Sequence, residues 1–400
     1  GVLMDYLVLA LNTICGRWVK AGERMPNRGV FFRQFSGVAR AEKPRSAAGF
    51  GEALRVRGLT DTAAGLPTAA LADEILTPGE GQVRALFVIG GNPLLSWPNQ
   101  EKTRRALESL ELLVVIDPML SATARHAHYV IGPRLGFESP AITFGNEGIT
   151  VYGLSLGYPE PYAQYQPALI EPPAGSDVLE DWRIFFELGR HMGLPLAFRG
   201  QPFDMASPPT TDQLLEAFVA KSRVPLEEIK RHPHGAIFPD PKPLADPKPP
   251  DWPHRLQLAA TSMMRELTAV AAALPIAAEQ IDRDYPWLLV TRREHAVYNS
   301  VGQRLPALRK RLSHNPAYVH PEDADALGLL DDMPIEIESR HGRTRARVRL
   351  ADDIRRGVIS LAHGFEDANP AALIDDASSF DALSGLPRMS AIPVRILRAG

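Results

Sequence analysis

One stretch of the chain alternates short apolar runs with amphipathic segments. Arg84–Ile89 (RALFVI) and Leu112–Ile116 (LLVVI) are short and mostly apolar, which is typical of strands buried on both faces. Gln100–Leu110 between them has the pattern of an amphipathic helix, and a short helix at Ser121–His128 leads to a third strand at Tyr129–Ile131. Strands that alternate with helices predict a parallel sheet of the doubly wound type.

The pattern changes after Tyr285, where short strands follow one another closely. Pro334–Ser339 and Thr344–Leu350 alternate apolar and polar residues on either side of a turn, which predicts a hairpin. Further short strands are predicted at Trp287–Thr291, Val358–Leu361 and Ile392–Leu397. So many short strands close together predict a small closed barrel.

These patterns predict the α/β fold class, with a doubly wound parallel-sheet domain followed by a C-terminal β-barrel domain. We place the first domain at residues 1–275 and the second at 284–400. The first domain opens with a helix, and two long loops interrupt it, at 22–51 and at 134–180. Proline-dense residues 235–253 are predicted to form an extended linker.

Charge and cysteine content exclude several classes of protein. A net charge of -3, from 44 basic and 47 acidic residues, gives no reason to expect nucleic acid or an anionic membrane as a partner. No run reaches the roughly 18 apolar residues that a bilayer span needs, so we expect no membrane span. The single cysteine, Cys15, cannot form an internal disulfide, nor supply the thiolates of an iron–sulfur cluster or of a cysteine zinc site.

The turn that follows the first strand is a candidate binding loop. It reads Gly90-Gly91-Asn92-Pro93 and is followed by Ser96. Ligands of doubly wound sheets bind beyond the carboxyl ends of the strands, and glycine lets the backbone approach a ligand closely. The alternative is a strand-to-helix turn that needs glycine and proline only for its shape.

Asp117 follows the second strand, and its position allows two interpretations. A carboxylate there can accept hydrogen bonds from ribose hydroxyls or from the edge of a guanine ring. It can equally be a turn residue that shapes the chain before Ser121. No G-x-G-x-x-G motif follows the strand, so NAD is not the predicted ligand.

Two further candidate loops follow strands of the predicted barrel. The segment TRREHAVYNS, from Thr291 to Ser300, carries an arginine pair that suits phosphate binding, with Asn299 and Ser300 as neutral donors. Its alternative is a solvated surface, and His295 alone is more often structural than catalytic. The segment after the strand Val358–Leu361 is His363-Gly364-Phe365, which is typical of a turn and by itself does not indicate a binding site.

The order of these segments resembles one family. GGNPLLSWPNQEKTRRALESLELLVVIDPMLSATARHAHYVIGP is similar to a segment of the molybdopterin oxidoreductases, which include dimethyl sulfoxide reductases, formate dehydrogenases and nitrate reductases. NPAYVHPEDADALGLLDDMPIEIESRHGRTRARVRLADDIRRGVISLAHGFED resembles the dinucleotide-binding cap of that family, ASSFDALSGLPRMSAIPVRI its closing motif and TRREHAVYNS its "TGR" loop. The chain departs from the family's pattern at Arg292, at Ala127-His128 and at Ile131-Gly132.

The resemblance implies a molybdenum or tungsten oxidoreductase that binds two pterin guanine dinucleotides, with a double-psi barrel as cap. It implies two-electron redox chemistry or oxygen-atom transfer on a small-molecule substrate, and an electron-transfer subunit as a possible partner. A non-catalytic electron-transfer relative of the same fold is the alternative. The residues that the resemblance and the loops assign to the dinucleotide are Gly90, Gly91, Asn92, Pro93, Ser96, Asp117, Thr123, Thr291, Arg292, Arg293, His295, Asn299, Ser300, His363, Gly364 and Asn369.

We expect the chain to be the C-terminal portion of a longer protein, because it opens within a predicted helix with Gly1 at its first position. The family's [4Fe-4S] cluster and its metal-ligating side chain would then lie upstream of Gly1. Cys15 is not at the family's ligand position, so no metal ligand is assigned in this chain. We therefore expect the 400 residues alone to be catalytically inactive.

Overall fold

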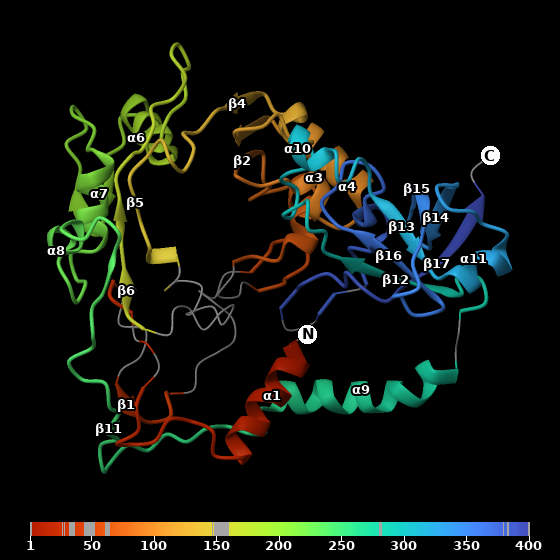
Figure 1. Ribbon diagram of the computed structural model, residues 1–400, viewed down its shortest axis with the longest axis horizontal. Helices are drawn as coiled ribbons and strands as arrows, with labels where there is room; N and C mark the ends of the chain where they lie inside the picture. Colours follow the sequence, from red (N-terminus) through yellow and green to blue (C-terminus); the bar gives the residue numbers. More distant parts are fainter. Residues whose placement is uncertain are drawn as a thin grey trace. The chain divides into compact units, whose positions relative to one another are not determined.

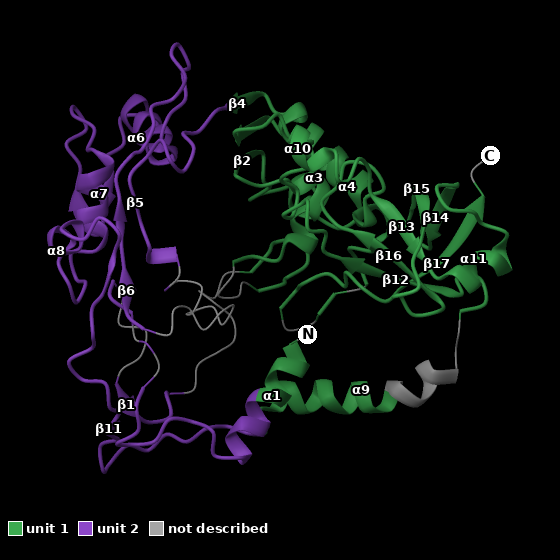
Figure 2. Ribbon diagram, viewed as in Figure 1, with its two compact units in different colours: residues 1–8, 45–130, 259–400 green, residues 9–44, 131–258 purple. Residues whose placement is uncertain are grey.

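The structure is a computed structural model that describes residues 2–25, 27, 29–31, 37–43, 53–60, 65–145, 147, 160–279, 282–378, 380–381 and 384–398, without the side chains of 273–279. By its internal contacts the chain divides into two compact units (Figure 2). The first comprises residues 1–8, 45–130 and 259–400, and the second comprises residues 9–44 and 131–258. The domain boundaries expected from the sequence stay a prediction.

The predicted alternation of strands and helices forms a three-stranded sheet in the first unit (Figure 1). Strands β2 (Ala85–Ile89) and β3 (Leu112–Ile116) pair in parallel, and β4 (Tyr129–Ile131) follows β3 in the strand order. Helix α4 (Gln100–Glu108) connects β2 to β3, and the side chain of Asn99 caps its first turn by accepting from Lys102 N. The carboxyl ends of β2 and β3 therefore lie side by side.

One face of this sheet packs on α4 and forms the core of the α/β part. Leu107, Leu113 and Val115 are fully buried in one cluster, and each such side chain contributes roughly 2 kcal/mol of hydrophobic stabilisation. Strand β3 is buried on both faces, as predicted. The same prediction was wrong for β2, an edge strand of the described sheet, because Phe87 and Ile89 on one of its faces are 37% and 51% exposed.

The C-terminal strands close into a six-stranded barrel with the order β12-β16-β13-β15-β14-β17. The predicted hairpin is present, with Glu336 opposite Arg345 in antiparallel register. Alternate residues such as Leu289, Ile337 and Leu361 point into the barrel and are fully buried. The strands are β12 (Trp287–Arg292), β13 (Pro316–Val319), β14 (Pro334–Ser339), β15 (Arg343–Leu350), β16 (Val358–Ala362) and β17 (Ile392–Arg398). This confirms the fold class: an α/β part followed by a closed barrel.

Some elements of the first unit differ from the sequence prediction. The short helix predicted at Ser121–His128 is a single 3-10 turn, η2 (Ala124–His126). Strand β13 was not predicted, because four residues are too few to show a period. Other elements of this unit are η1 (Thr68–Ala70), α2 (Leu71–Leu76), α3 (Pro93–Ser96), α9 (Thr261–Glu279), α10 (Pro306–Arg309), α11 (Pro321–Leu327) and η3 (Pro370–Leu373).

The second unit is built from short elements around a small core that includes Phe31, Ala163 and Ile229. Within the predicted loops, the described residues hold short strands and helical residues at 144–145 and 147, while 26, 28, 32–36, 44–51, 146 and 148–159 lie outside the described residues. The proline-dense linker contains two short strands and no helix. The elements are β1 (Val38–Ala39), β5 (Ala141–Ile142), β6 (Tyr162–Ala163), β7 (Tyr165–Gln166), α6 (Asp181–His191), β8 (Ala197–Phe198), β9 (Gln201–Pro202), α7 (Thr211–Phe218), α8 (Leu226–Lys230), β10 (Ala236–Ile237) and β11 (Asp246–Pro247).

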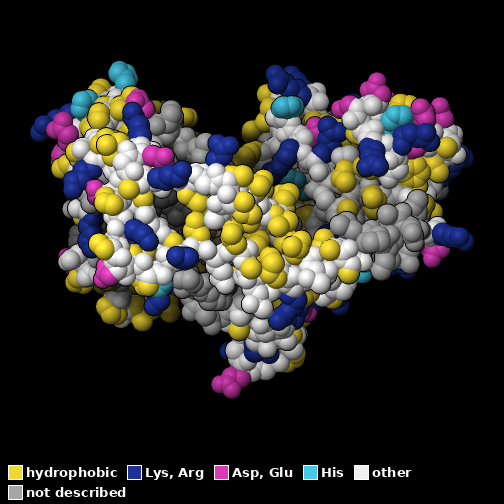
Figure 3. Space-filling model, turned by 90° about the horizontal axis from the view of Figure 1, so that it is seen from below, with side chains coloured by type: hydrophobic (Ala, Val, Ile, Leu, Met, Phe, Trp, Pro, Cys, Tyr) yellow, Lys and Arg dark blue, Asp and Glu magenta, His cyan; other side chains and the backbone are white. Residues whose placement is uncertain are grey.

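The predicted first helix is α1 (Val2–Ile14), and none of its residues is buried. Most of its large apolar side chains are exposed, with Met4 at 64% and Ile14 at 72%. Figure 3 shows one face of the molecule, on which apolar side chains gather. In the part of the chain that the structure describes, no helix is both long enough and apolar enough to cross a bilayer.

Candidate functional site

The turn after β2 has the open backbone that the sequence predicted for a binding loop. Gly90 has a φ of +55°, and a Cβ placed there would meet nothing within 4 Å. Its N–H donates to Ile116 O of β3 at 2.9 Å, which holds the turn against the neighbouring strand. Pro93 then opens α3, where the missing N–H of proline costs no helical hydrogen bond.

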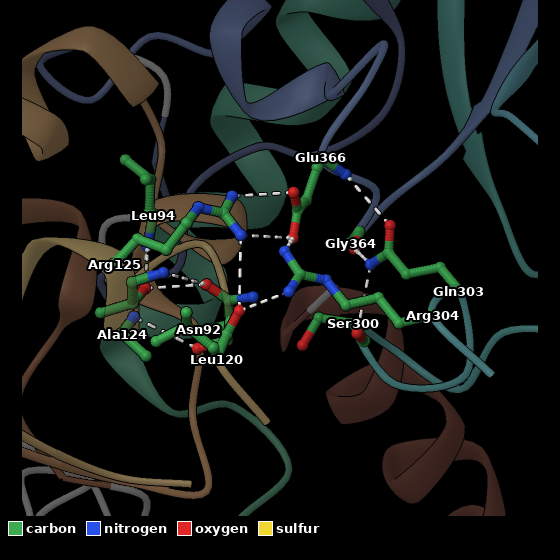
Figure 4. A network of polar contacts seen from close by, with 12 residues as sticks. Asn92, Leu94, Leu120, Ala124, Arg125, Ser300, Gln303, Arg304, Gly364 and Glu366 are labelled. Atoms are coloured by element: carbon green, nitrogen blue, oxygen red, sulfur yellow. Dashed lines mark hydrogen bonds and ion pairs between the residues drawn. The ribbon is translucent and has the colours of Figure 1, made fainter. Parts of the chain in front are cut away.

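Asn92 is the best-fixed polar side chain of this turn (Figure 4). Its Oδ1 accepts from Thr123 N at 3.2 Å and from Thr123 Oγ1 at 2.8 Å, and both residues are buried. Thr123 Oγ1 in turn accepts from Leu94 N at 3.1 Å. Among the described residues the Asn92 side-chain nitrogen has no acceptor, so its two N–H donors remain for a ligand with acceptor oxygens.

We expect Asn92→Ala to lower the free energy of unfolding by about 1–3 kcal/mol, because Thr123 would lose the buried acceptor of two hydrogen bonds. Denaturant unfolding measures this change. Thr123→Val removes the same hydroxyl at nearly constant shape, so the double variant should cost less than the sum of the single variants. Fully additive losses would contradict the contact.

Asp117 lies at the end of β3, beside this turn. Its Oδ1 accepts from Met119 N at 2.8 Å, which is the local turn bond that one of the two readings expected. Its Oδ2 has no hydrogen-bond partner among the described residues. The carboxylate therefore shapes the turn with one oxygen and keeps the other available, so both readings remain compatible with the structure.

The first barrel loop follows β12. Arg292 stacks its guanidinium 3.8 Å from the centre of the Tyr318 ring, and its Nε lies 3.1 Å from Glu294 Oε1. The Arg293 guanidinium donates to Asn299 Oδ1. Arg292 is thus held by the barrel itself, whereas Arg293 is an exposed residue directed at the second half of the loop.

The loop after β16 lies against this first barrel loop. His363 Nε2 is 3.4 Å from Asn299 Oδ1. Burial and the nearby Arg293 charge lower the pKa of the His363 imidazole, so the ring is neutral at pH 7. Gly364 has a φ of +82°, and a Cβ there would collide with the Asn299 carbonyl oxygen. The two loops therefore approach each other closely because residue 364 is glycine.

The remaining predicted residues lie at the borders of the site. Asn369 is buried, and its Nδ2 donates to Leu95 O at 3.2 Å, which ties the barrel to α3. Thr291 Oγ1 lies 3.3 Å from Ser390 Oγ. Ser96 and His295 are exposed. His128, where the family's pattern has an acid, accepts from Leu113 N through Nδ1 at 2.9 Å and so has a structural contact.

Three charged residues that the sequence did not single out join the α/β turn to the barrel loops. Glu366 accepts from Arg125 Nη2 at 2.8 Å and from Arg304 Nη2 at 2.5 Å (Figure 4). Arg125 and Glu366 are 241 residues apart, so no local pattern relates them. The structure thus brings the predicted loops at 90–96, 117–123, 291–300 and 363–369 into one compact unit.

The fold of this chain thus combines an α/β part with a closed barrel, and loops of the two parts contact each other. Residues 287–393 match the sequence model of the "Molydopterin dinucleotide binding domain". This range coincides with the observed barrel, from β12 to the start of β17.

Curated relatives point to the same family. The chain is 24% identical to the F420-dependent formate dehydrogenase subunit alpha of Methanocaldococcus jannaschii, over 81% of this chain and 45% of that protein. It is 23% identical to the assimilatory nitrate reductase catalytic subunit of Bacillus subtilis, over 80% of this chain and 42% of that protein. The chain thus spans less than half the length of these relatives.

A solved structure shows the same fold. Acetylene hydratase from Pelobacter acetylenicus aligns with 86% of this chain and 48% of its own, with a TM-score of 0.57 and 19% identity. These sequence matches confirm the resemblance to the molybdopterin oxidoreductase family, and residues 287–393 match the dinucleotide-binding domain of that family.

Proposed function

We propose that this chain supplies the pterin-guanine-dinucleotide-binding part of a molybdenum or tungsten oxidoreductase. The observation that carries the proposal is the dinucleotide-binding barrel, whose loops converge with the Asn92 turn in one unit. The unpaired amide donors of Asn92 and the open backbone at Gly90 fit a ligand rich in acceptor oxygens. When bound, such a cofactor supplies a metal centre for two-electron redox chemistry or oxygen-atom transfer.

The chain's own residues would bind and orient this ligand. Asn92, held by Thr123, would donate to oxygens of the dinucleotide, and Arg293 would add a cation beside them. The neutral His363 would add a hydrogen-bonding group without a second charge. Glycine at position 364 would keep the two barrel loops close enough for both to contact one ligand.

Relatives named formate dehydrogenase and nitrate reductase favour a small substrate and an electron-transfer partner over the non-catalytic alternative. A [4Fe-4S] cluster stays a proposal for a region outside this chain, because Cys15 is its single cysteine. Metal analysis and fluorescence of released oxidised pterin, on the natural protein from a cofactor-competent host, test the function. Absence of both metal and pterin would contradict it.

We further propose that Asp117 recognises the guanine edge with its available oxygen. Asp117→Asn replaces an acceptor with a donor facing the N1 and N2 donors of guanine. Charge-assisted hydrogen bonds contribute about 1.5–3 kcal/mol, so we expect roughly ten- to hundredfold weaker retention of the dinucleotide. The pterin content after dialysis measures this.

Asp204→Asn is the matched control for this variant. Asp204 forms the same kind of turn bond, from Ala206 N at 2.9 Å, in the other unit. Its substitution should leave pterin content unchanged. Equal pterin content in the Asp117 variant and the wild type would show that Asp117 only shapes its turn.

A further inference from the structure

A continuous set of polar contacts crosses from the α/β part to the barrel, and Glu366 stands at its centre (Figure 4). Its two carboxylate oxygens accept from Arg125 at 2.8 and 3.3 Å, and one of them also accepts from Arg304 at 2.5 Å. Both arginines also donate to the same carbonyl oxygen, that of Leu120, at 3.4 and 2.5 Å. One carboxylate and one carbonyl therefore hold two guanidinium groups together.

These contacts continue on both sides into the loops of the candidate site. On the α/β side, Arg125 lies in η2, two residues after the Thr123 that holds Asn92. On the barrel side, Glu366 N donates to Gln303 Oε1 at 3.2 Å. Gln303 Nε2 donates to Gly364 O at 2.7 Å and to Ser300 O at 3.1 Å. Glu366 thus links the Asn92 turn to both barrel loops.

The exposure of the Glu366 ion pairs indicates that they contribute little to the free energy of unfolding. The side chains of Glu366, Arg304 and Arg125 are 32%, 36% and 41% exposed, and ion pairs this exposed contribute little to the free energy of unfolding. Burial by itself would raise the pKa of the Glu366 carboxyl, but hydrogen bonds and charge from Arg125 and Arg304 together lower it, so the group is ionised at neutral pH. These contacts therefore contribute little to stability, and their main effect is to fix the positions of the residues that they join.

We propose that Glu366 is a positioning residue, whose carboxylate holds Arg125 and Arg304 and so fixes the Asn92 turn relative to the barrel loops around one ligand. This inference rests on the proposed function, which assigns those loops to the pterin dinucleotide. Glu366, Arg304 and Gln303 also line a pocket of about 660 Å³, so the residues that hold the loops together border open space. Without the carboxylate, two like charges remain side by side at the Leu120 carbonyl, and the barrel loops lose this ionic link to the segment that holds the Asn92 turn.

The test uses the natural protein purified with its pterin, and compares Glu366→Gln with Glu366→Asp. We expect Glu366→Gln to release pterin about three- to tenfold faster at low salt, with its unfolding midpoint unchanged within error. Salt should accelerate release more from the wild type than from the glutamine variant, because only the wild type has the Glu366 ion pairs that salt screens. Glu366→Asp retains the charge and should restore slow release in part.

Glu111→Gln is the matched control, since Glu111 forms an exposed ion pair with Arg84 at 3.1 Å in the same α/β part. It should release pterin at the wild-type rate. Wild-type release from Glu366→Gln would overturn the positioning role while leaving the proposed function intact. A wild-type protein that carries no pterin would overturn both.

Discussion

Replacing Asp376 with alanine is expected to lower the free energy of unfolding by about 3 kcal/mol. Its side chain is 6% exposed and accepts from Lys102 Nζ at 2.5 Å and from Asn99 Nδ2 at 2.9 Å. Removal of one partner of a buried ion pair leaves the other charge poorly compensated, which costs about 3–5 kcal/mol. Asp73, 2.6 Å from Lys102 Nζ, stays as a second partner and places the expected loss at the lower end.

The same substitution is expected to reduce ligand retention. Asp376 follows η3, whose cap Asn369 bonds α3, and Lys102 and Asn99 lie at the start of α4. Their contacts therefore join the barrel to the α/β part next to the candidate site. Burial lowers the pKa of Lys102, but Asp376 and Asp73 raise it more. A raised lysine pKa means that this stabilisation is fully present at neutral pH and is lost as the pH rises through the folded-state pKa.

Denaturant unfolding at pH 7 and at increasing alkaline pH measures the loss of stability and its pH dependence, and pterin content after dialysis measures ligand retention. Glu111→Ala is the matched control, because the Glu111–Arg84 pair is 66% exposed on both sides and should contribute less than about 1 kcal/mol. A loss for Asp376→Ala no larger than that of the control would contradict the buried pair. So would a loss that grows, not shrinks, at alkaline pH.

Gly364→Ala is expected to cost about 3 kcal/mol and to prevent tight binding of the dinucleotide. An L-residue at a φ of +82° is strained by about 1–2 kcal/mol, and the added Cβ would collide with the Asn299 carbonyl oxygen. The collision involves backbone, so a side-chain rotation cannot relieve it. The loops that carry Asn299 and His363 must then move apart.

Gly357→Ala separates strain from collision. Gly357 precedes the same strand, β16, with a φ of +74°, and a Cβ there would meet nothing within 4 Å. This control should cost about 1 kcal/mol and leave pterin content unchanged. Unfolding free energies and pterin content of the two variants give the comparison. Equal losses of stability would show that the loops tolerate the extra methyl group.

Local sequence was sufficient to predict the strands and helices that have a clear hydrophobic pattern of their own. Leu112–Ile116 was predicted with its final bounds, because an unbroken apolar run between turn residues has few alternatives. The hairpin of β14 and β15 followed from alternation on both sides of a turn. Strand β13 is too short to show a period, and its parallel pairing with β15 depends on residues far along the chain.

The sequence by itself also determined which loops carry polar and glycine-rich motifs, since those residues are adjacent along the chain, as in Gly90–Pro93. Only the tertiary structure decided how they are held. Thr123 is 31 residues from the Asn92 that it orients, and Arg125 is 241 residues from Glu366. It also decided that β2 is an edge strand with one exposed face. The physical reason is that a local pattern records which side chains avoid water, whereas pairing across a fold depends on where distant backbone segments meet.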